Sequence, residues 1–480
     1  MAIASPNSVE MSFIGDAAAC QTRAEPHAKH RTRNQCAARH MLNQSSARRH
    51  PAASVPIEVS IDACPITRRT RPFSLAREDS ADASWRARAR AEHDTLLDAM
   101  KHEFKHDKGI DYTPPAAEHN SAMYWHIHGV VSCHFNRAEE ASRSYRESLR
   151  LSPNSPEAAS ALHALGKVYL GQGKFEAADP VLQLAEERAD AAAQQHGQGQ
   201  SSYRAVLSML RLHAAAQKSG AAAAEASQQM ADLFCGQVVE LASLASIRGW
   251  SRASCRSVTA EWERSFRRRG ALSEQARADF AQRKYALLDA VLPTRLLSGF
   301  VQPWYRWLVG AEEAARALPN YELRWLEKRQ RFELLNEPIA EMLNVMLASL
   351  AAAVSGVQLV PSYAFPIRYP AGGFVEWHID QKDNELSLSL QIEISPAEHG
   401  WPLYFVDYNT TVRPGLPPPK TIALDAWHVN TAAQLVARNN QGILYKGQEL
   451  VHYRPALPAG LELMQVVFAW RLPNEESCNG

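Results

Sequence analysis

The sequence predicts a multidomain chain in which paired α-helices are followed by an all-β domain built from two facing sheets. Two observations lead to this fold class. Two stretches between residues 118 and 190 repeat the same spacing of glycine, alanine and large apolar residues. After residue 355, short segments rich in β-branched and aromatic residues alternate with clusters of Gly, Pro, Asn and Asp, which is typical of a sandwich or a closed double sheet.

The expected domain organisation follows from where the pattern changes. A chain of 480 residues is long enough for about three domains. We expect a disordered or targeting leader over 1–92, helical repeats over 93–230, a helical linker over 231–284, a β-domain over 285–472 and a tail over 473–480.

The leader has a strong bias towards arginine. Residues 20–55 carry seven Arg and Lys residues against the single acid Glu25, with many Ala, Ser, Gln and His between them. This composition is typical of an organellar transit peptide, but a disordered leader or an unused upstream start codon would have the same composition. Since no periodic apolar face follows until about residue 92, we expect little packed structure before that point.

Composition excludes several classes of protein. The net charge is +1, so nucleic acid is an unlikely partner without a local basic patch. No run of 18 uncharged apolar residues is present; residues 339–360 are broken by Glu341 and Asn344, so no membrane span is expected. The seven cysteines are scattered and fit neither a disulfide framework nor a CxxC zinc site, which favours an intracellular location, cytoplasmic or organellar.

The repeated helical stretches share one register. Gly129 precedes Ala141 by 12 residues and Gly166 precedes Ala178 by 12, and a large residue follows each alanine by four. This spacing resembles the tetratricopeptide repeat, although 37 residues separate the glycines where that family has 34. A third helical pair is expected over Ser201–Ser227, and further helices over Ala286–Leu297 and Glu337–Val354.

Strands follow the helices. Period-2 alternation or short apolar runs predict strands at Val357–Tyr369, Leu386–Ser395, Leu403–Val406, Thr421–Leu424, Gln441–Tyr445 and Leu463–Trp470.

One of these segments carries metal-ligand chemistry. His378 and Asp380 are two residues apart, so in a strand both side chains lie on the same face. His452, further along the chain, supplies a third ligand type. Two histidines and one carboxylate leave coordination positions open, an arrangement suited to non-heme Fe(II).

These residues occur in an order that resembles the iron(II)- and 2-oxoglutarate-dependent oxygenases of the prolyl 4-hydroxylase-like branch. The other matching parts are Tyr369-x-x-Gly372, the alternating strand Leu386–Ile392, Trp401-Pro402-Leu403, and Gly447 five residues before His452. The resemblance covers residues 285–472. It implies a double-stranded β-helix (jelly-roll) domain with supporting helices, a site that uses Fe(II), 2-oxoglutarate and O2, and a dioxygenase, in particular a hydroxylase.

The sequence departs from this family where 2-oxoglutarate is held. The family places an Arg or Lys about ten residues after the last histidine, whereas residues 461–464 here are Leu-Glu-Leu-Met. The nearest basic residues are Arg454 and Lys446, and Tyr369 and Tyr363 offer hydroxyls. An arginine binds a carboxylate with two parallel hydrogen bonds, so we expect Arg454 to be the main contact.

Other interpretations stay open at this stage. His378 and Asp380 could be a surface pair, His452 a core histidine, or the β-domain a barrel that has lost its metal. The chain would then be a non-catalytic interaction protein whose helical repeats bind a protein or peptide partner. In the oxygenase interpretation the repeats could instead deliver a peptide, protein or small-molecule substrate. His399 and His428 are expected in loops and not as ligands.

Overall fold

The computed structural model describes residues 83–103, 117–118, 121–155, 157–196, 201–217, 221–268, 270–310, 318, 322–335, 337–380, 384–407 and 432–474. All of these belong to one compact unit within Arg71–Gly480. The leader up to residue 82, the expected strand Thr421–Leu424, His428 and the end of the tail lie outside the described residues.

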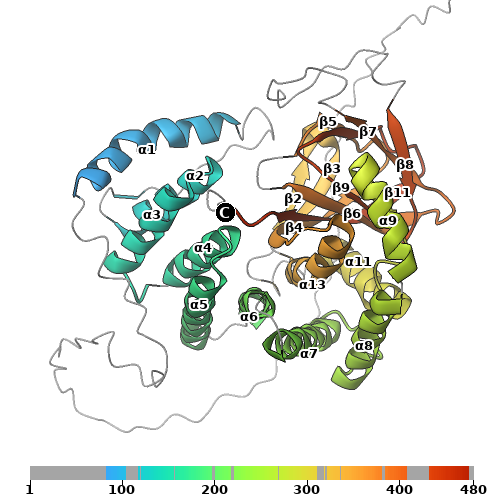
Figure 1. The fold of residues 1–480 in the computed structure, drawn as a ribbon, viewed down its shortest axis with the longest axis horizontal. Coiled ribbons are helices and arrows are strands. Elements are labelled where there is room, and N and C mark those ends of the chain that lie inside the picture. The colour runs from blue at the N-terminus through green and yellow to red at the C-terminus, as the bar shows by residue number, and fades with distance from the viewer. Residues whose placement is uncertain are drawn as a thin grey trace, which may run out of the picture. The chain divides into compact units, whose positions relative to one another are not determined.

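Helices make up the N-terminal half of the described chain (Figure 1). They form three hairpins, α2 with α3, α4 with α5 and α6 with α7, which confirms the predicted helical repeats. The helices of this half are α1 (Ala83–Glu103), α2 (Ala122–His134), α3 (Ala138–Leu151), α4 (Glu157–Gly171), α5 (Phe175–His196), α6 (Ser201–Ala216), α7 (Ala221–Leu244), α8 (Arg252–Arg268) and α9 (Gly270–Arg283).

The repeated glycines let the two helices of a hairpin approach closely. A Cβ atom added at Gly129 would lie 2.5 Å from the ring of Tyr145, and one added at Gly166 would lie 2.5 Å from Leu182. Tyr145 and Leu182 are the large residues that follow the two repeated alanines by four positions, and both are fully buried. The shared register in the sequence therefore corresponds to the same contact in two successive hairpins.

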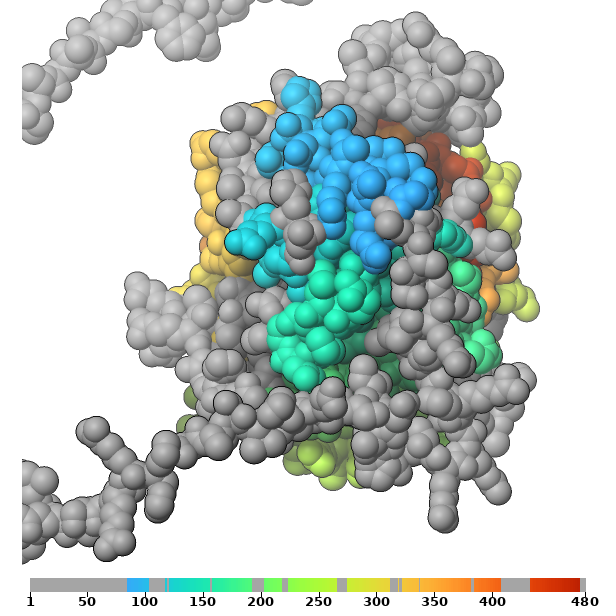
Figure 2. Space-filling model, turned by 90° about the vertical axis from the view of Figure 1, so that its left-hand side faces the viewer, coloured from blue at the N-terminus to red at the C-terminus, as the bar shows by residue number. Residues whose placement is uncertain are grey.

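Helix α1 begins at Ala83, within the segment where the sequence analysis expects little packed structure. Trp85 and Ala89 are buried in this first part of the helix, and Trp85 stacks on Trp125 with ring centroids 5.2 Å apart. Figure 2 shows α1 at the surface of the first hairpin. The expected boundary near residue 92 is wrong. The buried positions Trp85, Ala89 and His93 have helical spacing, but Ala89 and His93 are only weakly apolar, so the sequence signal is weak.

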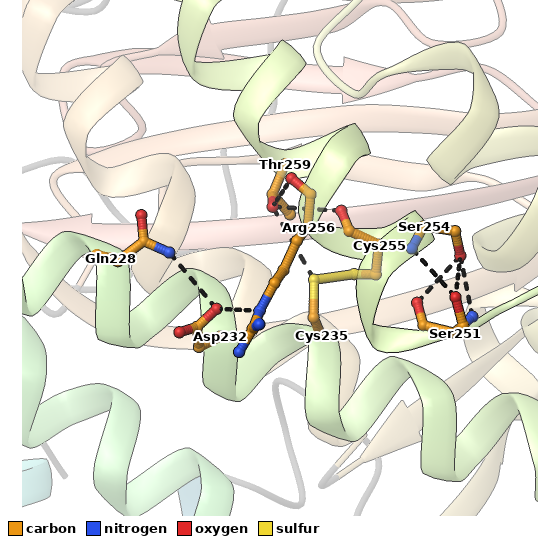
Figure 3. The surroundings of a disulfide bond; sticks show 8 residues. All are labelled: Gln228, Asp232, Cys235, Ser251, Ser254, Cys255, Arg256 and Thr259. Carbon is orange, nitrogen blue, oxygen red and sulfur yellow. Dashed lines mark hydrogen bonds and ion pairs between the residues drawn. A yellow bond between two sulfur atoms is a disulfide. The ribbon is translucent and has the colours of Figure 1, made fainter.

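A disulfide joins α7 to α8 (Figure 3). It links Cys235 to Cys255, and both residues are fully buried. Arg256 and Asp232 form an ion pair of 2.6 Å beside it. This pair corrects the expectation that the cysteines form no disulfide, since two cysteines 20 residues apart meet only because α7 and α8 pack together. Helix α7 also runs through residue 230, where a boundary between repeats and linker is expected.

The β-domain contains two antiparallel sheets. The larger has the order β1-β9-β6-β11-β4-β3-β2 and the smaller β5-β10-β7-β8. The strands are β1 (Tyr285–Leu288), β2 (Glu322–Leu326), β3 (Arg331–Leu335), β4 (Val360–Tyr369), β5 (Val375–His378), β6 (Leu386–Ser395), β7 (Trp401–Asp407), β8 (Ala433–Ala437), β9 (Gly442–Tyr445), β10 (Leu450–Arg454) and β11 (Glu462–Arg471).

The two sheets face each other and enclose the interior of a barrel. Tyr285 of β1 stacks on Phe405 of β7 with centroids 4.8 Å apart, and the ring of Tyr369 in β4 meets Trp401 of β7 at 4.8 Å. Helices α11 (Gln302–Gly310) and α13 (Pro338–Ser355), with the shorter α10 (Thr294–Leu296), support the larger sheet. The predicted jelly-roll with supporting helices is confirmed by this arrangement.

Strand β1 corrects one prediction. The sequence analysis expects a helix over Ala286–Leu297, but Tyr285–Leu288 pairs with β9 at the edge of the larger sheet. The side chains of β1 alternate between half-buried and buried, and Tyr285 is held by its stacking on Phe405. A four-residue strand is too short for its period to be separated from that of a helix.

Helix α13 is a core helix. It is the described helix that is long and apolar enough to span a bilayer by composition alone. It packs instead against α6, α9, β4 and β11. Its N-terminus is capped by the buried carboxylate of Glu337, which accepts hydrogen bonds from the backbone N–H groups of Ile339 at 3.0 Å and Ala340 at 2.7 Å.

The helical repeats contact the β-domain directly. Helix α6 packs on α13, and Gln358, just after α13, donates a hydrogen bond of 2.6 Å to Gln217 at the end of α6. The backbone N–H of Asn474, after the last strand, donates to the carbonyl of Gly171 at 2.9 Å. Part of the repeat surface is therefore occupied by the chain's own β-domain.

Candidate metal centre and cosubstrate pocket

The structure brings the three expected metal ligands together. His378 ends β5 and lies directly opposite His452 of β10 in the antiparallel register. Asp380 follows two residues after His378. Its Oδ1 lies 3.6 Å from Nε2 of each histidine. The three ligand atoms all lie within 4.8 Å of one another, a spacing that one metal ion can bridge.

Backbone hydrogen bonds set the tautomer of both histidines. Nδ1 of His378 lies 2.8 Å from the carbonyl oxygen of Glu376, and Nδ1 of His452 lies 3.0 Å from that of Leu450. Because a carbonyl oxygen only accepts, each Nδ1 must carry the proton, which leaves the Nε2 lone pair free to bind metal. Both Nε2 atoms are the ones that approach Asp380. The donor set therefore fits a divalent metal.

The carboxylate ligand is held by its neighbours. Ser387 donates a short hydrogen bond to Oδ2 of Asp380, and the Asp380 N–H donates to the carbonyl of Gly447 at 2.9 Å. A Cβ atom at Gly447 would overlap Oδ2 of Asp380, so this position requires glycine. Burial alone would raise the pKa of Asp380, but His452, His378 and Ser387 together outweigh burial and lower it.

The ligands differ in exposure. The side chain of His452 is 2% exposed and that of Asp380 12%, whereas that of His378 is 30% exposed. Burial lowers the pKa of His452 to about 4, so its imidazole is neutral and able to act as a ligand at neutral pH. The site thus opens to solvent on the side of His378.

Arg454 points into the barrel from the same strand as His452. Strand β10 continues through residue 454, so both side chains lie on one face. Its guanidinium donates to the carbonyl of Trp401 at 2.6 Å and to Oγ of Ser389 at 3.1 Å. Arg454 is 2% exposed, and burial lowers its pKa to about 10.

All contacts of Arg454 with described residues are to neutral groups, the ring of Trp401 among them, 4.8 Å from the guanidinium carbon. A cation buried among neutral partners is costly unless an anion joins it. The interior of the barrel is therefore suited to a ligand that carries a carboxylate.

The other expected cosubstrate residues have different surroundings. Tyr369 is fully buried, and its hydroxyl accepts hydrogen bonds from Arg331 at 3.0 Å and Gln465 at 3.5 Å. The hydroxyl of Tyr363 accepts from Asn384 at 3.3 Å, on the metal side. Lys446 is 37% exposed and pairs with Glu449 at 2.8 Å. The structure therefore places the two tyrosines in the barrel but not the Lys446 ammonium.

Sequence reasoning missed Arg331 of β3. Arg331 is 6% exposed, and its guanidinium donates to the Tyr369 hydroxyl and pairs with Glu333. Strands β2 and β3 carry alternating charged and apolar residues, a pattern that could have indicated a hairpin. Ser389 and Gln465 were also missed, although the alternation in β6 could have indicated that Ser387, Ser389 and Gln391 share the inner face.

His399 stays outside the site, as expected. Its ring lies 3.8 Å from Glu398, and its side chain is 50% exposed. His428 lies outside the described residues.

Among known proteins, this chain is similar to solved structures but not to any family model or curated sequence. The structure is similar to SnoN, a non-heme α-ketoglutarate-dependent epimerase from nogalamycin biosynthesis, at 14% identity over 42% of this chain and 83% of that one, with a TM-score of 0.32.

Two further neighbours are prolyl hydroxylases. A Pseudomonas putida prolyl-4-hydroxylase matches at 14% identity over 42% of this chain and 98% of its own, with a TM-score of 0.28. A Trichoplax adhaerens prolyl hydroxylase in complex with a peptide fragment of hypoxia inducible factor matches at 10% identity over 44% and 93%, with a TM-score of 0.30. Because these identities and TM-scores are low, the activity of this chain must be argued from its own residues.

Proposed function

We propose that this chain is an iron(II)- and 2-oxoglutarate-dependent dioxygenase. The observation that carries the proposal is the pairing of two features inside one barrel. His378, Asp380 and His452 converge with their metal-binding atoms within 4.8 Å. Two residues beyond His452, the buried Arg454 contacts only neutral groups among the described residues. A metal held by these three ligands has open positions that a 2-oxo acid can chelate, and the buried cation can bind a second carboxylate. A metal-chelating 2-oxo diacid meets both requirements.

Each residue has a defined part in this proposal. His378, Asp380 and His452 would hold the metal, with their orientation set by Glu376, Leu450 and Ser387 through hydrogen bonds. When bound, iron with 2-oxoglutarate and O2 supplies the oxidation of a substrate C–H bond, with release of succinate and carbon dioxide.

Arg454 would bind the distal carboxylate and fix the orientation of the cosubstrate, with Tyr369 beside it. Apolar clusters around Trp401 and Phe405 line the interior and exclude water.

Hydroxylation is the proposed reaction. Asp380 fills the carboxylate position of the ligand set, so that position is closed to a halide. The substrate would approach on the side of His378, the most exposed of the three ligands. A peptide, a protein or a small molecule remains the proposed substrate class.

The alternative is a non-catalytic interaction protein with a degenerate β-domain. The buried Arg454 and the intact ligand set favour the enzyme, because a scaffold would gain nothing from an unpaired interior cation. Helix α6 is also partly occupied by α13, which reduces the repeat surface open to a partner. We propose that a protein or peptide partner, if the repeats bind one, uses the surface that the β-domain leaves free.

The test is anaerobic reconstitution with Fe(II), followed by addition of 2-oxoglutarate and O2. We expect about one iron per chain and formation of succinate that depends on both iron and O2. A chain that binds no iron, or one that binds iron without binding or consuming 2-oxoglutarate, would contradict the proposal and support the interaction protein.

A further inference from the structure

Gln391 is a buried polar residue of the barrel for which the proposed chemistry gives no role. It lies on β6, on the inner face with Ser387 and Ser389, while Leu388 and Leu390 pack towards the helices. It is 1% exposed. Neither Oε1 nor Nε2 of its side chain has a hydrogen-bond partner among the described residues.

The polar side chains of Gln465 and Ser389 beside it are both hydrogen-bonded. Gln465 lies directly opposite Gln391 on β11. Its Oε1 accepts from Ser389 at 3.2 Å, and its Nε2 donates to the Tyr369 hydroxyl at 3.5 Å. Ser389 in turn accepts from Arg454 at 3.1 Å. A hydrogen-bonded chain therefore runs from Arg454 through Ser389 and Gln465 to Tyr369, and Gln391 lies beside it without joining it.

Along the inner face of β6, successive residues lie progressively further from the metal ligands. Ser387 contacts the metal ligand Asp380, and Ser389 contacts Arg454. Gln391 is the next residue on that face, about 7 Å further along the strand. Past a bulge, the inward residue is the apolar Ile394, which packs in the cluster around Trp401. Gln391 thus marks the point where the interior changes from polar to apolar.

A buried amide without partners costs free energy of folding, and an apolar side chain of similar volume would avoid that cost. The cost is recovered when a ligand supplies the missing hydrogen bonds. The charge of Arg454 favours a carboxylate at this depth. The Nε2 group of Gln391 is a donor that the same carboxylate can use.

We propose that Gln391 is a specificity-determining residue of the cosubstrate pocket. It donates from Nε2 to the distal carboxylate held by Arg454, and it closes the polar part of the barrel behind that carboxylate. The pocket then accepts a five-carbon 2-oxo diacid and disfavours one with an additional methylene group. This inference rests on the proposed function, because it assumes that a metal-chelating 2-oxo diacid enters the barrel.

The experiment measures dissociation constants of 2-oxoglutarate and 2-oxoadipate with the full chain loaded anaerobically with Fe(II), together with the melting temperature of the ligand-free protein. Gln391→Met keeps the volume and removes both hydrogen-bonding groups. We expect it to weaken 2-oxoglutarate binding about tenfold, to leave iron binding unchanged and to raise the melting temperature of the ligand-free protein.

Gln391→Asn keeps the amide and shortens the side chain by one methylene. We expect its preference to shift about tenfold from 2-oxoglutarate towards 2-oxoadipate. Gln302→Met is the matched control, since Gln302 donates at 2.8 Å to the carbonyl of Ile392 from the helix side of the same strand. The control should lower the melting temperature and leave both dissociation constants unchanged.

Unchanged 2-oxoglutarate binding in Gln391→Met would overturn the inference while leaving the proposed function intact. An unchanged preference in Gln391→Asn would overturn the role in chain length. Failure of the iron-loaded wild-type chain to bind 2-oxoglutarate would overturn the proposed function, and this inference with it.

Discussion

His128 in the first helical hairpin and Gln391 in the barrel are both buried polar side chains, but only His128 has hydrogen-bond partners among the described residues. Nδ1 of His128 lies 3.0 Å from the hydroxyl of Ser144, and Nε2 lies 3.1 Å from the carbonyl of Ala89. Those contacts tie α2 to α3 and α1. Gln391 has no partner among the described residues, and Arg454 has only neutral ones.

The difference separates two uses of buried polarity. In the helices, hydrogen bonds and ion pairs link one helix to the next, so they contribute to stability. In the barrel, the Gln391 amide has no partner and Arg454 has no anion among the described residues, and we propose that both serve a ligand at the expense of stability. Substitutions in the helices should therefore lower stability and spare ligand binding, whereas substitutions of Gln391 or Arg454 should weaken ligand binding without lowering stability.

The largest effect is expected for His452→Ala. Loss of a group that only orients a metal ligand costs about 10–100-fold in metal affinity. Loss of a ligand itself should therefore weaken Fe(II) binding at least about a thousandfold, roughly 4 kcal/mol. Metal titration of the purified chain measures this. His399→Ala is the control, since His399 lies 50% exposed beside Glu398 and should bind iron like the wild type. If His452→Ala binds as much iron as the wild type, His452 is not a metal ligand.

The next largest effect is expected on the stability of the helices, from loss of the disulfide between Cys235 and Cys255. Replacing both by Ser should lower the free energy of unfolding by about 3 kcal/mol, because the bond closes a loop of 20 residues in the unfolded chain. Denaturant unfolding measures this. Iron affinity should not change. A variant as stable as the oxidised wild type would contradict the role of the bond.

Arg454→Met should act on ligand binding. It keeps the length of the side chain and removes its charge, so affinity for 2-oxoglutarate should fall at least about tenfold, roughly 1.4 kcal/mol, while iron binding persists. Lys446→Met is the control, because Lys446 pairs with Glu449 outside the barrel. If Lys446→Met weakens 2-oxoglutarate binding and Arg454→Met does not, Lys446 and not Arg454 binds the cosubstrate.

The smallest effect is expected at Glu147 in the first hairpin. Arg150, at 2.8 Å, and Arg86, at 3.4 Å, lower the pKa of this carboxyl below its ordinary 4.5. Because the pKa is lowered in the folded protein, the ionised carboxylate stabilises the fold at pH values above 4.5. Glu147→Gln should therefore cost about 0.5–1 kcal/mol at pH 7, and the difference should disappear as the pH falls below 4.5. A difference that persists at low pH would point to packing instead.

The sequence predicts most of the parts that have a period or a spacing. The helical hairpins follow from the glycine and alanine register, and β6 agrees with the expected Leu386–Ser395 because its alternation is strict over ten residues. The ligand set follows from strand geometry, since His378 and Asp380 share a face. These features depend on local order, which a single sequence carries.

The remaining features depend on tertiary contacts. Strand β1 is held by Phe405, which is distant in sequence, and α1 by Trp125. The disulfide requires α7 and α8 to be adjacent. The unpaired state of Gln391 is visible only once β9 and β11 flank β6. None of these features has a signature within its own segment.

The position of β11 constrains the timing of folding during synthesis. This strand lies within the larger sheet, between β6 and β4, yet it follows every other described strand in the sequence. The ribosome releases the helical hairpins much earlier, so they can fold while the chain is still growing. The barrel must wait, with the edges of β4 and β6 unpaired, until residues 462–471 emerge. Unpaired strand edges can pair with another chain, so β4 and β6 are exposed to aggregation during this delay.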